Sequence, residues 1–404
     1  MKIGKFGRQN NLTVDTIRHY MDLGLLVPEK KGGHYDFDDS CQKDLDLIIE
    51  FKSMGFSLHE IKTILTFKNL GMLAGYEENA YYQSLFSHKS EKLEEEIIRL
   101  TKANEKIKEK ISEFNEKPVH TKLSMGIHID HLDLLACPNC DSPLSLEKGS
   151  INKNQIIDGE LACGCQTYTV ESGILISTTS NEKFPISNGD DYISEYILNT
   201  DSFYLETVQK GLQTLKRKIT GLELDNKVIL EPGTGIGFLL RTIYNDLPND
   251  CVYIAVDYNI EKQRILKGLL ERTGIKKNIL FICSDFSTIP IKEKSIDILI
   301  DNAGTSNYSF DNVDFLIELL NGLVKKEAYL IGTYLAFKKF SMNSKVLPPY
   351  RDNFIPSKIR SKIEGLHFKL LEEDTSELMS KGGRYENYFV PGEEVFNYMV
   401  IGKR

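Results

Sequence analysis

The 404-residue chain has no apolar run approaching the ~18 residues that a membrane-spanning helix needs. Its first residues, MKIGKFGRQNN, lack the apolar centre of a signal peptide, so we expect a cytoplasmic protein with no membrane partner. Cysteine is scarce, with seven residues, and in that compartment it favours metal binding or free thiols over disulfides. A positive net charge is also missing. Because the chain carries −8, any nucleic-acid-binding surface must be local.

The first seventy residues predict short helices separated by tight turns. Thr13 is a good N-cap for a helix in which Val14, Ile17 and Tyr20 recur at helical spacing, and Gly24 ends that helix. A shorter helix around Phe6 precedes it, so the pair predicts a helix-turn-helix. Pro28 and Gly32–Gly33 then indicate a hairpin-like wing, and two amphipathic helices follow at 39–54 and 57–67.

Charge in this head is polarised along the sequence. Residues 1–35 hold six Lys/Arg and three Asp/Glu, a net of 6 − 3 = +3, whereas residues 36–70 hold four and seven, a net of 4 − 7 = −3. The basic half contains the second helix and the wing. This pattern favours a DNA-binding face, although a solvated basic surface is the alternative.

The segments TVDTIRHYMDLGLLVP, GGHYDF and FKSMGFSLHEIKTIL resemble the winged helix-turn-helix of MerR-family transcription regulators. The resemblance implies binding to double-stranded DNA, and most relatives carry arginine where this chain has His34. The residues expected at the DNA by this resemblance are Thr13, Thr16, Arg18, Tyr20, His34 and Tyr35.

A long helix is predicted at about 87–116, after a short helix and turn. Its apolar positions are separated by 4, 3, 4, 3, 4 and 3 residues, which is the seam of a coiled coil. The seam residues are Leu93, Ile97, Leu100, Asn104, Ile107, Ile111 and Phe114. A seam asparagine costs stability but can fix register. We expect a homodimer, as in MerR-like regulators, facing an operator with two-fold symmetry. The alternative is a helix packed on its own domain.

Four of the seven cysteines lie close together as C-x2-C and C-x-C, separated by twenty-two residues. Two such knuckles can point four thiolates at one tetrahedral zinc ion, so we expect a structural zinc ribbon. The expected ligands are Cys137, Cys140, Cys163 and Cys165, with His120, His128 and His131 as less favoured candidates. The segment also resembles the ribbon of some rRNA guanine methyltransferases. Metal sensing at the dimer helix is disfavoured because residues 42–136 contain no cysteine.

The C-terminal half alternates strand-like and helix-like segments from about residue 190, which predicts a mostly parallel sheet of Rossmann-like α/β type. The sequence VILEPGTGIGF places a glycine-rich turn between a buried strand and a helix. Glu231 precedes the turn, and Asp257 ends the next strand, 257 − 237 = 20 residues after the last glycine. Such a carboxylate can accept two ribose hydroxyls, and the bare turn admits an anionic group.

This order of motifs resembles a class I S-adenosylmethionine-dependent methyltransferase. The resemblance implies that the turn passes under the methionine part, that Asp257 binds ribose, and that residues after the third and fourth strands face adenine and the methyl group. The expected cofactor-binding residues are Glu231, Gly233, Gly235, Gly237, Asp257, Asp285, Phe286, Asp301 and Asn302, with Ala303 beside them.

The methyl acceptor and any catalytic residue are not identified by the sequence. The fourth strand ends in IDNAGTSNYSF rather than N/D-P-P-Y/F, which disfavours adenine- and glutamine-like amino groups. Candidate acceptor-site residues are Tyr192, Tyr196, Tyr204, Tyr308 and His367.

We therefore expect a multidomain protein: a winged helix-turn-helix head at 1–70, a connector and dimerisation helix at 71–118, a zinc ribbon at 130–178 and a methyltransferase-like domain at 190–404. The leading interpretation is a MerR-type regulator that binds S-adenosylmethionine and methylates a small molecule. One alternative is a sensor whose methyltransferase fold is inactive. Another is a methyltransferase acting on nucleic acid.

Overall fold

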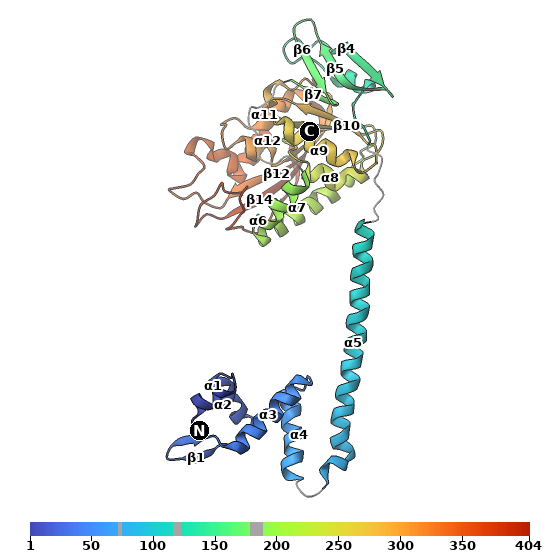
Figure 1. Cartoon of the computed structure of the whole chain (residues 1–404). Coiled ribbons are helices and arrows are strands. Elements are labelled where there is room, and N and C mark those ends of the chain that lie inside the picture. The colour runs from blue at the N-terminus through green and yellow to red at the C-terminus, as the bar shows by residue number, and fades with distance from the viewer. Residues whose placement is uncertain (72–74, 116–122, 178–188) are drawn as a thin grey trace. The chain divides into compact units, whose positions relative to one another are not determined.

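A computed structural model describes residues 1–71, 75–115, 123–177 and 189–404, which belong to two compact units, residues 1–118 and residues 119–404 (Figure 1). Each unit has its own hydrophobic core and is described by itself. The predictions that concern residue 116, His120 and the end of the ribbon at residue 178 lie outside the described residues. No helix among the described residues is long and apolar enough to cross a membrane.

The head begins with the two predicted helices, α1 (Ile3–Gln9) and α2 (Val14–Asp22). Thr13 caps α2 as expected, because its Oγ1 accepts the backbone N–H of Thr16 at 3.1 Å. That hydrogen bond satisfies one of the donors that a helix leaves free at its first turn. The cap fixes where α2 starts and therefore which of its residues face outward.

The wing and two longer helices complete the head. Strands β1 (Glu29–Lys31) and β2 (His34–Asp36) form an antiparallel hairpin with two glycines at its tip. Helices α3 (Asp39–Ser53) and α4 (Leu58–Leu70) follow, and Ser57 and Glu60 form a reciprocal capping box at the start of α4. The predicted order of elements is thereby confirmed.

The long helix α5 (Ala80–Asn115) follows a short 3-10 turn, η1 (Tyr76–Glu78). It begins at Ala80 rather than near residue 87, because Tyr82, Leu85 and Phe86 pack against the core of the head. The sequence pattern missed this first part because its apolar positions serve the head rather than the seam. The connector is therefore shorter than predicted.

The heptad seam of α5 forms an exposed stripe within this chain. Its apolar side chains are between 44% and 62% exposed: Leu93, Ile97, Leu100, Ile107, Ile111 and Phe114. The interpretation in which the seam packs on its own unit is therefore wrong for the described residues. Large apolar side chains in a row are rarely left in water, so the stripe marks an interaction surface.

The second unit is built on one sheet whose central strands are parallel. In space they run β10-β9-β8-β11-β12, and two more strands extend the sheet beyond β12: β14 pairs antiparallel with β12, and β13 pairs antiparallel with β14. This order places the β8 and β11 ends side by side, where a ligand crevice is expected. The strands are β8 (Val228–Pro232), β9 (Val252–Asp257), β10 (Asn278–Cys283), β11 (Ile296–Asn302), β12 (Val324–Phe337), β13 (Lys369–Thr375) and β14 (Val395–Lys403).

Helices cover both faces of this sheet, as the continuous burial of its central strands requires. In β8, Ile229 packs with α7, α8 and α9, whereas the next residue, Leu230, packs with α11 and α12. Successive residues of a strand point to opposite faces, so one strand serves both layers. The helices are α6 (Gly189–Asn199), α7 (Ser202–Thr220), α8 (Phe238–Ile243), α9 (Ile260–Glu271), α10 (Gly304–Tyr308), α11 (Leu316–Leu320) and α12 (Pro356–Gly365).

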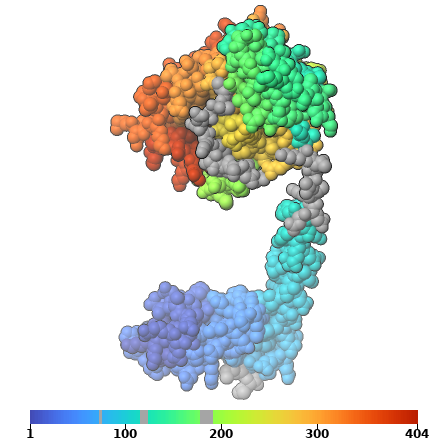
Figure 2. Space-filling model, turned by 45° about the horizontal axis from the view of Figure 1, so that its top comes forward, coloured from blue at the N-terminus to red at the C-terminus, as the bar shows by residue number. Residues whose placement is uncertain are grey.

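The cysteine-rich ribbon, predicted as a domain at 130–178, pairs with the same sheet and belongs to the same compact unit. Its last strand pairs in parallel with β10, so that Leu175 lies opposite Ile282. An unpaired edge of a parallel sheet leaves backbone groups unsatisfied, and the ribbon covers that edge. In Figure 2 the ribbon, in green, lies directly on the body of this unit. Its strands are β3 (Ile127–His128), β4 (Ser145–Asn152), β5 (Gln155–Ala162), β6 (Thr167–Glu171) and β7 (Ile174–Ile176).

A buried polar contact strengthens this junction. The Glu271 carboxylate, at the end of α9, accepts the backbone N–H of Met125 at 2.8 Å and pairs with Lys267. Both charged side chains are less than a tenth exposed. Because a buried charge is tolerated only when it is paired and hydrogen-bonded, this arrangement fixes the entry into the ribbon against the α/β layer.

Candidate functional site

Five of the six residues expected at DNA lie toward the outside of the head. Thr13, Arg18, His34 and Tyr35 are exposed, and Thr16 is half-buried. The wing residues project from the β1–β2 hairpin, and Arg18 is held by a surface ion pair with the Asp15 carboxylate at 3.3 Å. An arginine that is exposed and only weakly paired remains available to phosphate.

Tyr20 corrects one of these predictions, because its side chain is 2% exposed and packs in the core of the head. Its neighbour His19 is exposed instead and was missed by the sequence analysis. The signal was present: Ile17 and Tyr20 are three residues apart and so share the face of α2 that turns inward. Arg18 and His19 then face outward.

The four cysteines meet at one point of the ribbon, with ligand atoms within 4.8 Å of one another. Sulfur–sulfur distances are 3.4 Å for Cys137–Cys165, 3.8 Å for Cys140–Cys163 and 3.3 Å for Cys140–Cys165. A tetrahedral zinc ion with bonds of about 2.3 Å holds sulfurs about 3.8 Å apart, so these thiols fit it after a small expansion. Neither His128 nor His131 belongs to the cluster.

Backbone hydrogen bonds explain why the knuckles converge. The N–H of Asp141 donates to the Cys137 carbonyl at 2.8 Å and closes the first turn, and the N–H of Cys163 donates to the Gln166 carbonyl at 3.0 Å and closes the second. The Tyr168 hydroxyl, from β6, donates to Cys137 Sγ at 3.4 Å. A donor to a metal-bound thiolate is the usual outer support of such a site.

The glycine-rich turn between β8 and α8 uses its three glycines differently. All three have positive φ, between +59° and +72°. A Cβ on Gly237 would lie 2.3 Å from Leu266 Cδ1 of α9, and a Cβ on Gly233 would lie 3.0 Å from the Gly304 Cα. A Cβ on Gly235 would meet no atom within 4 Å. Two glycines therefore allow close packing, and Gly235 leaves open space for a ligand beside its backbone.

Asp257 supports this turn at the end of β9. Its Oδ2 accepts the Gly235 N–H at 2.9 Å and its Oδ1 accepts the Asn259 N–H at 2.9 Å. Burial raises the pKa of this carboxyl group, although Lys262 and the backbone donors act in the opposite direction. The carboxylate therefore touches the one open position of the turn. Its contact with ribose stays a prediction.

Glu231 and Asp301 are as deeply buried as Asp257, with 2% and 0% of their surface exposed against 2%. Glu231 Oε2 accepts the Tyr253 hydroxyl at 2.6 Å, and Asp301 Oδ1 accepts the Thr305 N–H at 2.8 Å. Burial raises the pKa of Glu231 to about 8 and that of Asp301 to about 6. These hydrogen bonds help to position the turn and the start of α10, and a contact of either carboxyl group with the cofactor stays a prediction.

Aromatic rings gather at the ends of β9 and β10. Phe286 lies edge-on to Tyr258 and to Tyr308, with ring centroids 6.2 Å and 6.1 Å away. Asp285 precedes Phe286 and caps a short 3-10 turn by accepting the Ser287 N–H at 2.8 Å. Stacking surfaces of this kind suit a flat base. Tyr258 was missed by the sequence analysis, although its place directly after Asp257 was a usable signal.

Asn302 and Ala303 end β11 beside the turn. Asn302 is half-buried and lies opposite Thr333 of β12, and the Ala303 N–H donates to the Thr333 carbonyl at 2.9 Å. Ala303 has a φ of +61°, a conformation that few residues with a side chain adopt. The strand therefore stops sharply here, and the chain turns back into α10.

Four of the five acceptor-site candidates lie around the same end of the sheet. The Tyr196 ring is 5.4 Å from Phe238, the residue after the glycine turn, and 6.1 Å from the Tyr192 ring. The Tyr204 hydroxyl is hydrogen-bonded to the Tyr388 hydroxyl. Burial raises the pKa of Tyr192 to about 12, so its hydroxyl stays neutral in the physiological range.

His367 is the exception and was placed wrongly. It lies just before β13. The first residue of β13, Lys369, is opposite Lys403 of β14, and Lys403 is opposite Tyr329 near the beginning of β12. The glycine turn lies at the carboxyl ends of the parallel strands, so His367 and the turn are at opposite ends of the strands. Because β13 pairs antiparallel with β14, and β14 pairs antiparallel with β12, β13 runs in the same direction as the parallel strands and starts at their amino ends.

A winged helical head with a helix that exposes Arg18 and His19, followed by a sheet with a glycine turn at its switch point, defines a DNA-binding module joined to a nucleotide-binding type of α/β domain. Comparison with protein families supplies the particulars. Residues 1–68 match the MerR HTH family regulatory protein, residues 128–189 the Trm112p-like protein and residues 223–367 the methyltransferase domain. The chain is thus a fusion of a MerR-type head, a Trm112-like zinc ribbon and a methyltransferase domain.

Curated relatives match the head alone. The HTH-type transcriptional activator TipA of Streptomyces coelicolor is 34% identical over 65 residues, which are 16% of this chain and 26% of that protein. The HTH-type transcriptional regulator ZntR homolog of Haemophilus influenzae is 34% identical over 71 residues, 17% of this chain and 53% of that protein. The match thus spans about a quarter to a half of the length of these relatives.

Solved structures resemble the C-terminal half. A SAM-dependent methyltransferase from Aquifex aeolicus is 17% identical, with 47% of this chain and 88% of that chain covered at a TM-score of 0.33. Phosphoethanolamine N-methyltransferase 2 of Haemonchus contortus in complex with S-adenosyl-L-methionine is 13% identical, with 48% and 52% covered at a TM-score of 0.36.

Proposed function

We propose that this protein is a homodimeric, DNA-binding transcription regulator whose C-terminal domain binds S-adenosylmethionine and methylates a small molecule. Cofactor or substrate state would be coupled to operator binding. The observation that carries this proposal is the presence in one chain of an exposed, capped recognition helix and a glycine turn with an open position beside a buried carboxylate.

For DNA, the argument rests on the outward face of α2 and on the wing. Arg18 and His19 leave the helix on the side opposite its core, and His34 and Tyr35 stand on the hairpin. A helix of this kind reads the major groove while the wing contacts phosphates. Two heads of a dimer would then address a two-fold symmetric operator.

For the cofactor, the chain supplies a fitted surface rather than reactive groups. Gly235 leaves space for the methionine part, and the Asp257 carboxylate beside it would accept the ribose hydroxyls. The Tyr258 and Phe286 rings would pack against the base. S-adenosylmethionine supplies an electrophilic methyl group. Transfer to an acceptor that is already nucleophilic needs mainly alignment, which the tyrosines near Phe238 are placed to provide.

A sensor without turnover shares every one of these features and differs only in the fate of the cofactor. A nucleic-acid methyltransferase ranks third. Three of the seven Lys/Arg side chains in the basic stretch at 337–362 form ion pairs, Lys338 with Glu394 at 2.7 Å, Lys358 with Asp352 at 3.8 Å and Arg360 with Glu364 at 3.0 Å. These pairs reduce the positive charge that the stretch offers to a phosphate backbone.

The deciding experiment is calorimetric titration of the full-length protein with S-adenosylmethionine and its demethylated product. We expect micromolar binding by the wild type and at least a tenfold loss in Asp257→Ala, since the carboxylate both shapes the turn and stands at the ribose. Asp246→Ala, at an exposed surface carboxylate, is the matched control. Absence of binding by the wild type would contradict the cofactor proposal.

Turnover and DNA binding are tested next in the same preparation. Release of the demethylated product in the presence of candidate acceptors separates an enzyme from a sensor. Selection of bound fragments from random DNA, followed by gel shift with and without cofactor, tests the regulator. Selected sites without two-fold symmetry would contradict the dimeric reading of the head.

A further inference from the structure

Three acidic side chains lie at or next to the carboxyl ends of neighbouring strands, beside the glycine turn: Glu231 of β8, Asp257 of β9 and Asp301 of β11. We call these three carboxyl groups the acid cluster. The Gly235 N–H of the turn donates to Asp257 Oδ2 at 2.9 Å. A Cβ on Gly304 would lie 2.4 Å from the Pro232 carbonyl oxygen and 3.0 Å from Asp301 Oδ1, so Asp301 is also held close to the turn. The acid cluster therefore lies beside the segment that would hold the cofactor.

The negative charge of the acid cluster is buried without a matching cation. Each of the three side chains is at most 2% exposed. None of them forms an ion pair with a lysine or arginine among the residues that the structure describes. Within the same residues, Asp301 Oδ2 is buried and has no hydrogen-bond partner. Because a buried charge is costly unless it is paired, such a cluster favours a ligand that brings a positive charge.

Glu231 is the member of the acid cluster that keeps a proton most readily. Burial raises its pKa to about 8 and the Asp301 and Asp257 carboxylates add to this rise, whereas the Tyr253 hydroxyl acts in the opposite direction. That hydroxyl, from β9, donates to Glu231 Oε2 at 2.6 Å. From α9, Lys262 acts on Asp257 and lowers its pKa. The cofactor-free protein therefore holds a proton on Glu231 at neutral pH.

The proposed cofactor and its demethylated product differ by one charge. S-adenosylmethionine has a positive sulfonium centre, whereas the product has a neutral thioether, and the two share their amino, carboxylate, ribose and base groups. A positive charge beside the acid cluster attracts the ionised carboxyl groups and so favours loss of the proton from Glu231. A neutral sulfur has no such effect.

We propose that the acid cluster selects the charged cofactor over the neutral product, and that the cofactor expels one proton from the cluster to solvent as it binds. In methyl transfer the acceptor forms a bond to the methyl carbon, and the electron pair of the broken C–S bond stays on sulfur. The positive charge then leaves the sulfur, a proton returns to the cluster from solvent, and the product is released more readily. This selection rests on the proposed function, because it acts at the cofactor site.

The dependence on pH has a definite sign. At pH 7 the Glu231 proton must be removed before the cluster can attract the sulfonium fully, since the pKa of the group is about 8. Affinity for S-adenosylmethionine should therefore rise from pH 6 to pH 8 and level off above about pH 8, whereas affinity for the product should change little. We expect the ratio of the two affinities to grow roughly tenfold between pH 6 and pH 8.5.

Calorimetric titration of the full-length protein with both ligands at pH 6, 7 and 8.5 measures this ratio. At pH 7 the titration is repeated in two buffers that differ in their enthalpy of protonation, which counts the protons released on binding. We expect release of roughly one proton per cofactor bound and of almost none per product bound.

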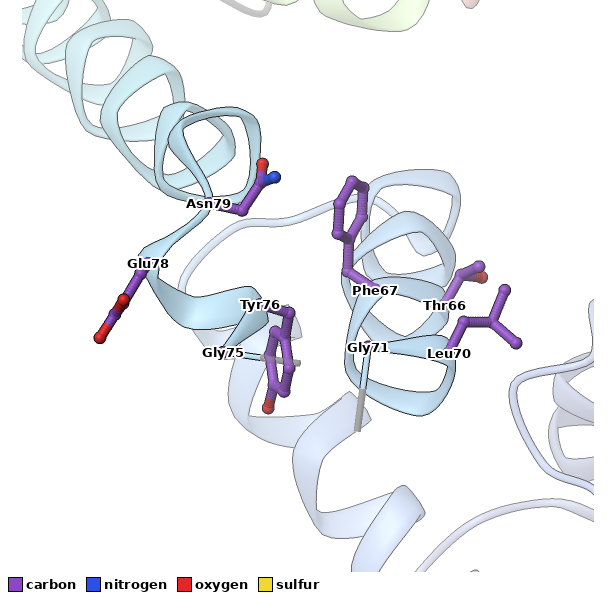
Figure 3. Close-up of a pocket in the computed structure, with 8 residues that line it drawn as sticks. All are labelled: Thr66, Phe67, Leu70, Gly71, Gly75, Tyr76, Glu78 and Asn79. Carbon is purple, nitrogen blue, oxygen red and sulfur yellow. The ribbon is translucent and has the colours of Figure 1, made fainter. Parts of the chain in front are cut away.

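Three variants assign the proton. Glu231→Gln should abolish proton release and make the affinity ratio independent of pH. Tyr253→Phe removes a donor that favours the charged carboxylate, so the cofactor affinity should level off at a higher pH than in the wild type. Glu78→Gln is the matched control and should behave as the wild type. Glu78 is exposed in the first unit, where it lines a cavity and points away from the Phe67 and Tyr76 rings (Figure 3).

Two results would overturn the role of the acid cluster while leaving the proposed function intact. These are cofactor binding by the wild type without proton release, and the same pH dependence of the affinity ratio in Glu231→Gln as in the wild type. If Glu231→Gln does not fold, the proton count of the wild type and the shift in Tyr253→Phe decide. Absence of binding of both ligands at every pH would overturn the proposed function as well.

Discussion

Gly235 and Gly237 both have a left-handed backbone conformation, but a side chain at Gly235 would enter open space and one at Gly237 would meet Leu266. Substitution at Gly235 should therefore affect mainly cofactor binding, and substitution at Gly237 mainly stability. Alanine at either position costs about 1–2 kcal/mol of backbone strain. At Gly237 the new Cβ also meets Leu266, which adds about 1–3 kcal/mol of overpacking. We expect Gly237→Ala to lower Tm more, and Gly235→Ala to lower cofactor affinity at least tenfold, measured by thermal melts and calorimetry. Equal cofactor affinity in Gly235→Ala and wild type would contradict the open position as a ligand site.

Glu231 makes the stability of the second unit depend on pH. Its pKa is raised by burial from 4.5 to about 8, so the folded state retains a proton that the unfolded state releases. Its stabilising effect is complete below about pH 4.5 and is lost as the pH rises toward 8. Glu231→Gln keeps a hydrogen-bond acceptor for the Tyr253 hydroxyl without this titration. We expect urea melts at pH 5 and pH 8.5 to show a smaller loss of stability in the variant. An equal loss in both proteins would show that Glu231 does not titrate in this range.

At the scale of elements, α5 offers two neighbouring isoleucines that differ only in their place on the helix. Ile97 belongs to the seam and Ile98 does not, yet they are 62% and 54% exposed in the single chain. If the seam joins two copies, Ile97→Asp places a charge in a buried interface, while Ile98→Asp leaves it in water. We expect a dimer in Ile98→Asp and the wild type, and mostly monomer in Ile97→Asp, by sedimentation at micromolar concentration. A monomeric wild type would exclude the seam as a dimer interface.

Strand β7 links the metal site to the sheet, so removal of zinc should destabilise the neighbouring strand β10 as well as the ribbon. In the chain, the knuckle at Cys163–Cys165 and then strand β6 come directly before β7. Strand β7 in turn pairs with the edge of β10. Structural zinc contributes folding energy to small ribbons. We expect a chelator to lower the Tm of the second unit by several degrees and to expose amides of β10 to hydrogen exchange. In Cys163→Ser the same chelator should cause no further shift. Unchanged amide hydrogen exchange in β10 would mean that the ribbon unfolds without destabilising the sheet.

At the scale of the whole molecule, coupling between the two units must be reciprocal if it exists. A cofactor that changes DNA affinity by some factor requires DNA to change cofactor affinity by the same factor. We expect the ratio of operator affinities with and without S-adenosylmethionine to equal the ratio of cofactor affinities with and without operator. Both ratios are obtained by calorimetry and gel shift at one ionic strength, since salt alone alters DNA binding. Ratios that both equal one would leave two independent functions on one chain.

Several features followed from the sequence because they depend on residues close together in the chain. The Thr13 cap, the wing glycines, the heptad spacing of α5 and the glycine turn after Glu231 each specify a local conformation through short-range sterics and hydrogen bonds. The paired cysteines likewise fix a metal-binding geometry by spacing, once two turns bring them together. Apart from the start of α5, elements with such local signals were predicted with bounds close to those in the structure.

Other features depend on how segments that are far apart in the sequence pack together. Whether Tyr20 or His19 faces outward depends on which side of α2 the head core buries, and the ribbon joins the sheet because β10 has an edge that β7 can pair with. His367 was misplaced because it precedes β13, which runs parallel to the central strands and starts at their amino ends, and the start of α5 moved because the head supplies its partners. Burial and strand pairing are properties of the assembled chain, so the local sequence can permit them but cannot choose among them.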